Sequence, residues 1–152
     1  MRRLSGVLLV CAIVCVPAFS HGHGDLFAQA AAPQKTTFTG DLVVMLVAIN
    51  GDKTADYEQV LTKLKEVLSK SEAPEAKDQL AGWKVIKSSM PNPDGSVVYV
   101  HVITPVKDAD YSIMNNIYAG VKDATEQKTI YELYRGSFKQ PLGTIQGSVV
   151  AK

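Results

Sequence analysis

The sequence predicts an α+β domain built on one four-stranded antiparallel sheet with helices on one face. Two continuous apolar runs, DLVVMLVAI at 41–49 and SVVYVHVIT at 96–104, have the length and β-branched content of fully buried strands. Each run precedes a segment whose apolar residues recur at helical spacing, and each such segment precedes a weaker strand. The resulting order is β-α-β-β-α-β, within the length of one domain.

In the first half, the strand at 41–49 is followed by Asn50-Gly51, and Thr54 or Asp52 is expected to cap a helix. Pro74 then opens a short helix that ends near Leu80, and a strand with two lysines is expected over 83–89. The long helix is indicated by one apolar stripe: Tyr57, Val60, Leu61, Leu64 and Leu68.

In the second half, the turn sequence PNPDG joins the strand at 83–89 to the strand at 96–104, which predicts a hairpin. Asp110 is expected to cap the next helix, and an interruption at 120–123 divides the helical segment into two pieces. A turn at 141–143 and a final, weaker strand at 144–150 complete the domain.

The four expected strands differ in polarity, and this difference predicts their order. The first and third strands are apolar throughout, whereas the second and fourth carry lysine, glutamine and serine. Edge strands often carry such residues, so we expect the order 4-1-3-2. Helices on one face would leave the other face apolar and bare, which is unusual for a soluble monomer. We therefore expect a homodimer formed through the open sheet face, with the leader or another partner as the alternative cover.

The N-terminus reads as a secretion signal over 1–30, followed by a disordered leader over 31–39 and a single domain over 40–152. Ala28-Gln29-Ala30 predicts cleavage before Ala31, and Ala18-Phe19-Ser20 is a second acceptable site. The apolar run is too short for a stable membrane anchor. Because of this signal, we expect the mature chain in the periplasm or outside the cell. Both cysteines lie within the signal, so the mature chain would hold no disulfide.

The charge of the expected mature chain argues against nucleic-acid binding. Residues 31–152 contain 13 lysines and one arginine against eight aspartates and six glutamates, so their formal net charge is zero. Nucleic-acid-binding domains usually carry a basic excess. A single arginine also argues against a bidentate phosphate-binding cluster.

The element order, the two apolar runs and the entry Gly82-Trp83 into the second strand resemble the dimeric α+β-barrel proteins. The resemblance spans roughly residues 40–150 and implies a ferredoxin-like arrangement. It also extends to small exported bacterial proteins without an assigned activity. Members of the wider group include monooxygenases and haem-degrading enzymes, and the latter use Asn, Trp and His around a pocket. This sequence offers Asn50, Trp83 and His101 for those roles, although His101 falls on a predicted strand rather than on a helix.

The candidate ligand-pocket residues are His101, Trp83, Tyr99 and Asn50, and no catalytic residue, metal ion or cofactor is expected. His101 is either a base or haem ligand, or a hydrogen-bonded core histidine. His21 and His23 would form a copper site only if cleavage followed Ser20.

We therefore expect a non-enzymatic exported domain that binds a protein partner or a small apolar ligand. The alternative is a monooxygenase-like enzyme that acts on an aromatic or haem-like substrate. Because one fold serves many functions, the fold alone does not decide between them.

Overall fold

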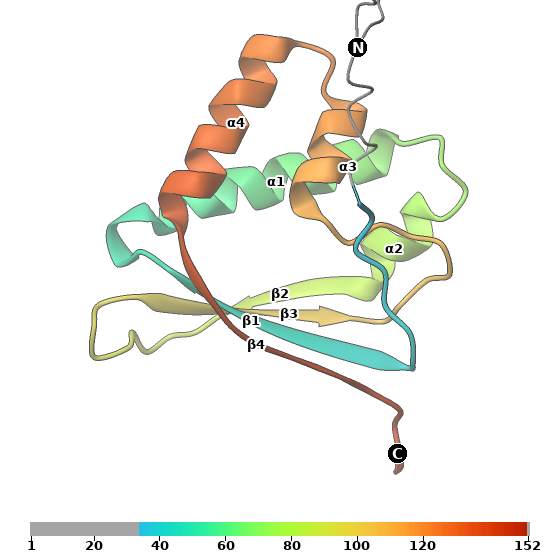
Figure 1. Cartoon of the computed structure of the whole chain (residues 1–152), viewed down its shortest axis with the longest axis horizontal. Coiled ribbons are helices and arrows are strands. Elements are labelled where there is room, and N and C mark those ends of the chain that lie inside the picture. The colour runs from blue at the N-terminus through green and yellow to red at the C-terminus, as the bar shows by residue number, and fades with distance from the viewer. Residues whose placement is uncertain (1–33, 152) are drawn as a thin grey trace, which may run out of the picture. The chain divides into compact units, whose positions relative to one another are not determined.

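The computed structural model describes residues 34–151 and has an α+β fold (Figure 1). Its helices and strands, in chain order, are β1 (Leu42–Ile49), the 3₁₀ turn η1 (Gly51–Lys53), α1 (Thr54–Lys70), α2 (Ala76–Gly82), β2 (Trp83–Lys87), β3 (Val97–Ile103), α3 (Ile113–Gly120), α4 (Ala124–Ser137) and β4 (Phe138–Gly147). The expected signal at 1–30, together with His21 and His23, lies outside the described residues.

The four strands form one sheet in the order β2-β3-β1-β4, and every neighbouring pair is antiparallel. This is the order expected from the sequence, with the two apolar strands at the centre. In the central pair, Met45 lies opposite His101 and Val47 opposite Tyr99. Trp83 lies opposite Ile103 on the other side of β3, and Val85 opposite His101. The register therefore fixes which side chains share a face.

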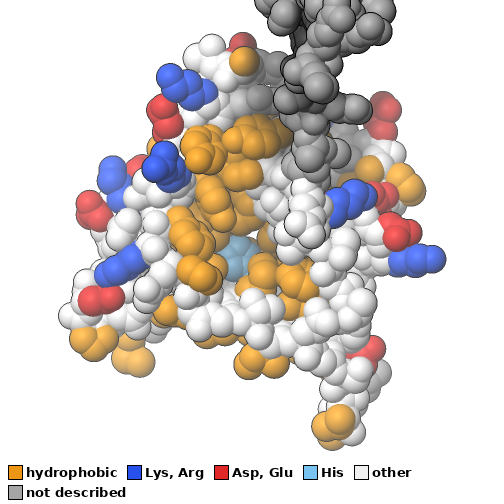
Figure 2. Space-filling view, in the orientation of Figure 1, with side chains coloured by type: hydrophobic (Ala, Val, Ile, Leu, Met, Phe, Trp, Pro, Cys, Tyr) orange, Lys and Arg blue, Asp and Glu red, His pale blue; other side chains and the backbone are white. Residues whose placement is uncertain are grey.

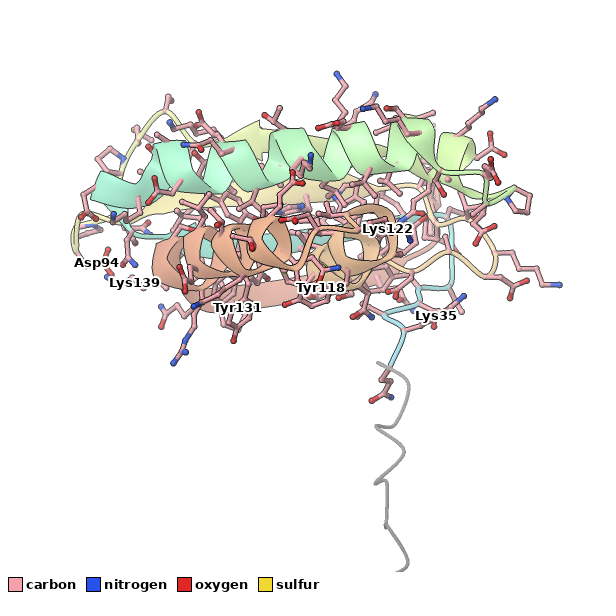
Figure 3. All side chains as sticks on the ribbon, turned by 90° about the horizontal axis from the view of Figure 1, so that it is seen from above. Lys35, Asp94, Tyr118, Lys122, Tyr131 and Lys139 are labelled. Carbon is pink, nitrogen blue, oxygen red and sulfur yellow. The ribbon has the colours of Figure 1, made fainter. Side chains whose placement is uncertain are left out.

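The helices α1 to α4 of residues 34–151 lie on one face of the sheet (Figure 1). From above, α3 and α4 lie along the same side of α1 (Figure 3). The hydrophobic core between these layers takes alternate residues of the strands, such as Val43 and Ile103, and the apolar stripe of α1. A second, smaller cluster is built on Ile49, Tyr57 and Tyr99. Both central strands thus place one set of alternate residues against the helices.

Two helix starts differ from the sequence expectation. The N-cap residue of α1 is Lys53, and no side chain makes a capping hydrogen bond there. The 3₁₀ turn η1 leads directly into this helix. The cap of α3 is Ser112 rather than Asp110, and its hydroxyl accepts from the backbone N–H of Asn115. Asp110 instead accepts from the backbone N–H groups of Ser112 and Thr36.

The last strand begins earlier than expected. Strand β4 starts at Phe138, directly after α4, and runs through Pro141 and Gly143, so these residues do not form a turn. The pairing with β1 shifts register between Leu46 and Val47 and again between Ala48 and Ile49. An edge strand tolerates proline because its outward N–H groups need no partner. At its start, Lys139 forms an ion pair with Asp94 of the β2–β3 turn, with 2.8 Å between Nζ and Oδ2 (Figure 3).

The other face of the sheet is apolar, and no helix of residues 34–151 lies on it. Its side chains follow from the alternation and the registers, because their strand neighbours point into the core. Ile86 is 56% exposed and Ile145 is 69% exposed. We call this surface the open face. Its apolar residues are Leu42, Val44, Leu46, Ile86, Val98, Val100, Val102 and Ile145.

Residues 34–39 of the expected leader contact the domain. The backbone carbonyl of Thr36 accepts from the N–H of Tyr111 at 2.7 Å, and the ring of Phe38 lies 5.4 Å from that of Tyr111. Among the described residues, no helix has the length and apolar character needed to cross a membrane.

Candidate functional site

His101 lies at the centre of a buried polar group between the sheet and α1. It is only 1% exposed, because β3 is an inner strand and the side chain points toward the helices. Its Nε2 lies 2.8 Å from the hydroxyl oxygen of Tyr57, on α1. Its Nδ1 lies 3.0 Å from the indole nitrogen of Trp83, on β2. The structure thus brings together His101 and Trp83, and adds Tyr57.

The hydrogen bond from Trp83 determines the tautomer of His101. An indole N–H only donates, so Nδ1 of His101 accepts and carries no proton. The remaining ring proton of the neutral imidazole is then on Nε2, which donates to the hydroxyl oxygen of Tyr57. Both ring nitrogens are therefore engaged within the protein.

Burial keeps this group uncharged. Desolvation lowers the pKa of His101 to about 4, because the imidazolium would lose its hydration in the core. Desolvation also raises the pKa of the Tyr57 hydroxyl well above its ordinary value, and the neighbouring Tyr134 and Tyr99 add to this effect. Near neutral pH, both side chains are neutral and hydrogen bonded.

Aromatic rings surround the hydrogen-bonded group. The ring of Tyr57 meets that of Tyr99 edge to face at 5.0 Å and stacks with that of Tyr134 at 6.4 Å. The indole of Trp83 meets the ring of Tyr111 at 5.4 Å. Such contacts fix the orientation of the rings and so hold the hydrogen-bonding atoms in place.

A second polar group continues from Tyr99 to the surface. The hydroxyl of Tyr99 donates to Oε1 of Glu58 at 2.7 Å, and Nζ of Lys87 donates to the same oxygen at 2.8 Å. The hydrogen bond from Lys87, and then that from Tyr99, lowers the pKa of Glu58. Burial, and then the bond to Glu58, raises the pKa of Tyr99 to about 12. These contacts connect α1 to β2 and β3.

The fourth candidate, Asn50, lies elsewhere. Its side-chain amide donates to the carbonyl oxygen of Gly136 at 3.2 Å and so connects the end of β1 to the end of α4. Met45 lies opposite His101, and Asn50 is five residues further along the chain. At roughly 3.3 Å per residue, this separation is about 16 Å. Asn50 thus does not join the His101 group.

Sequence reasoning missed the role of Tyr57. The helical stripe placed it in the core, but it gave no sign that its hydroxyl would meet a histidine 44 residues away. Tyr99, His101 and Ile103 alternate along β3 and so share one face, and all three are buried.

Apolar side chains also gather between α3 and α4 (Figure 2). Tyr134 and Met114 are partly buried hydrophobic residues that belong to these two helices.

A separate apolar groove of about 380 Å³ lies between α1, α2 and the edge strand β2. We call it the β2 groove. Trp83 is shared between this groove and the His101 group. The groove is lined by Leu61, Thr62, Leu64, Lys65, Leu68, Leu80, Trp83 and Val85.

Within residues 34–151, no group of three His, Cys, Asp or Glu side chains is placed to hold a metal ion. Comparison with family models, with curated proteins and with solved structures found no match to this chain. The features that indicate a function are therefore the open face, the His101 group and the β2 groove.

Proposed function

We propose that this chain is an exported, non-enzymatic binding domain that forms a homodimer through its open face. In this proposal it binds a protein partner or a small apolar ligand. The observation that carries the proposal is the apolar open face, which no helix of the described chain covers. The proposed export rests on the signal-like composition of residues 1–30.

A ferredoxin-like arrangement is part of the proposal. The sheet order β2-β3-β1-β4, read from its other edge, is 4-1-3-2, and all its neighbours are antiparallel. In the helical layer, α1 and α2 connect β1 to β2, and α3 and α4 connect β3 to β4. Each helical connection of the ferredoxin-like β-α-β-β-α-β pattern is here divided into two helices.

The composition of the open face supports a second copy as its cover. Val44 and Leu46 on β1 lie beside Val100 and Val102 on β3, so the apolar residues of the two central strands are contiguous. Contiguous apolar surfaces of several hundred Å² are typical of interaction sites. A two-fold axis through this face would place the apolar centre of one copy on the apolar centre of the other. By alternation, Lys84 lies on the same face but on the edge strand, where its ammonium group can reach water.

The state of His101 supports binding rather than catalysis. A general base or haem ligand needs a ring nitrogen that is free to meet substrate or iron. Here Trp83 occupies Nδ1 and Tyr57 occupies Nε2, so one hydrogen bond would have to break first. The burial of the ring adds to this barrier.

The monooxygenase-like alternative has one observation in its favour, which is the strip of apolar side chains between α3 and α4 (Figure 2). An aromatic or haem-like substrate could lie along this strip. Incubation of the purified protein with haem or a quinol under air distinguishes the two functions. If the unsubstituted protein causes an oxygen-dependent loss of the substrate and the His101→Ala variant does not, the enzyme is favoured. Unchanged substrate favours the binding domain.

Light scattering during gel filtration tests the dimer. At micromolar concentration we expect twice the monomer mass for the purified protein, and the monomer mass for Val100→Lys, whose ammonium group would be buried at the interface. Tyr118→Lys, on the exposed side of α3, is the matched control and should remain a dimer. A monomer mass for the unsubstituted protein would refute the proposed pairing.

A further inference from the structure

The β2 groove is an apolar surface separate from the open face, and it lies on the helix side of the sheet. Leu61, Leu64 and Leu68 of α1 form one wall. Leu80 of α2 and Val85 of β2 stand opposite. Its volume of about 380 Å³ falls near the lower end of the range of small-molecule sites, roughly 300–1,000 Å³.

A second copy paired through the open face would not fill this groove. Successive residues of a strand point to opposite faces, so Ile86 lies on the open face and Val85 faces the groove. Val85 is 37% exposed, although its neighbours in the groove are apolar. The groove would therefore stay open in such a dimer.

The charge at the groove indicates the polar end of that occupant. Lys65 lines the groove, is exposed and has no ion pair among the described residues. The other lysines along η1 and α1 each pair with a carboxylate, and they are Lys53, Lys63 and Lys70. The hydroxyl of Thr62 donates to the carbonyl of Glu58 within α1, and no carboxylate lines the groove. An apolar channel with one unpaired cation suits a molecule with an apolar body and one negative end.

We propose that the β2 groove binds a single-chain amphipathic carboxylate of the fatty-acid type. Its alkyl chain lies along the leucines of α1, over Leu80 and Trp83, and its carboxylate meets Nζ of Lys65. This assignment rests on the proposed binding function and names its ligand class. It does not depend on the dimer, because the groove and the open face lie on different sides of β2.

Trp83 provides the measurement. It is the single tryptophan of the sequence and lines the groove, so its emission reports directly on an occupant. A brominated dodecanoate, whose bromine atoms quench an indole on contact, is titrated into the purified protein, processed as the producing cell leaves it. We expect saturable quenching, and displacement of the brominated probe by plain dodecanoate.

Two substitutions on the same strand separate the groove from the open face. Val85→Glu places a carboxylate in the groove and should weaken binding of the probe by roughly tenfold or more. Ile86→Glu is the matched control, since it introduces the same charge at the next residue of the strand, which lies on the open face. It should leave probe binding unchanged and, if the dimer proposal holds, release monomers.

Lys65→Gln tests the contribution of the cation. It should weaken binding of dodecanoate by up to about fivefold, because exposed ion pairs contribute little, and it should leave binding of dodecanol unchanged. Absence of saturable quenching, or equal quenching in the unsubstituted protein and Val85→Glu, would overturn the assignment. Equal weakening of the acid and the alcohol by Lys65→Gln would overturn the role of Lys65. The mass of the unsubstituted protein in light scattering does not depend on probe binding, so the dimer is judged separately.

Discussion

The indole N–H of Trp83 donates to Nδ1 of His101 at 3.0 Å, and this bond connects the edge strand β2 to the inner strand β3 through their side chains. It fixes the ring of His101 as the tautomer that donates to Tyr57. The indole N–H of Trp83 on the edge strand thus fixes a hydrogen-bonded group that extends through His101 to Tyr57 on α1. The first predictions concern this arrangement.

Removal of either partner of His101 should destabilise the fold. Trp83→Phe leaves Nδ1 without a donor, and Tyr57→Phe leaves Nε2–H without an acceptor. Each should reduce the free energy of unfolding by about 1–3 kcal/mol, because a buried polar atom then lacks a partner. Urea denaturation measures the change. Tyr118→Phe is the matched control, since that side chain is 41% exposed, and it should alter stability by less than about 0.5 kcal/mol.

The stability of the protein should fall as the pH is lowered from 7 to 4. The pKa of His101 is about 4 in the folded protein, against 6.5 for the unperturbed residue, so the unfolded chain binds more protons in this interval. The contribution is present above pH 6.5 and is lost as the pH falls toward 4, by roughly 3 kcal/mol in total. Urea denaturation at several pH values tests this slope. His101→Gln should lack this component, and an identical slope in that variant would assign the effect to carboxylates.

The sequence predicted more of the fold than of the site. The two apolar runs identified β1 and β3 as central strands, because the lysines, glutamine and serine of the other two strands are typical of edge strands. The start of β4 was placed wrongly, since Pro141 and Gly143 are typical of turns and only their edge position makes them acceptable in a strand.

Within the site, His101 and Trp83 were candidates from residue type alone, and their contact depends on the β2–β3 register. Tyr57 could not be paired with His101 from sequence, because its helical position places it in the core without specifying a partner. The β2 groove was missed for a similar reason. It combines leucines of two helices with Val85, and nothing in their spacing shows that the edge strand leaves a space between them.

The packing of α3 on α1 should be sensitive to one methyl group. A Cβ atom added at Gly120 would lie within 3 Å of the side chain of Val67, so Gly120→Ala requires α3 to shift. We expect a loss of about 1–3 kcal/mol in the free energy of unfolding. Gly136→Ala is the control, because no atom lies within 4 Å of its added Cβ. Within α4, this change should be neutral or stabilise the protein by up to about 1 kcal/mol.

Export predicts a defined N-terminus. Sequencing of the protein recovered from the producing cell should begin at Ala31, after the Ala28-Gln29-Ala30 site. A start at His21 would instead indicate cleavage after Ser20 and would make the copper interpretation of His21 and His23 testable. An intact Met1 in the recovered protein would contradict the proposed export.

The central claim is that a second copy buries the open face, and site-directed cross-linking tests it most directly. Both cysteines lie within the first 15 residues, so Val100→Cys in the processed protein introduces a single thiol at the centre of that face. Packed sheets are roughly 10 Å apart, a distance that a short bis-maleimide can span. We predict a covalent dimer for Val100→Cys and none for Tyr118→Cys at the same concentration. Failure of Val100→Cys to cross-link, or equal cross-linking at both positions, would contradict the account.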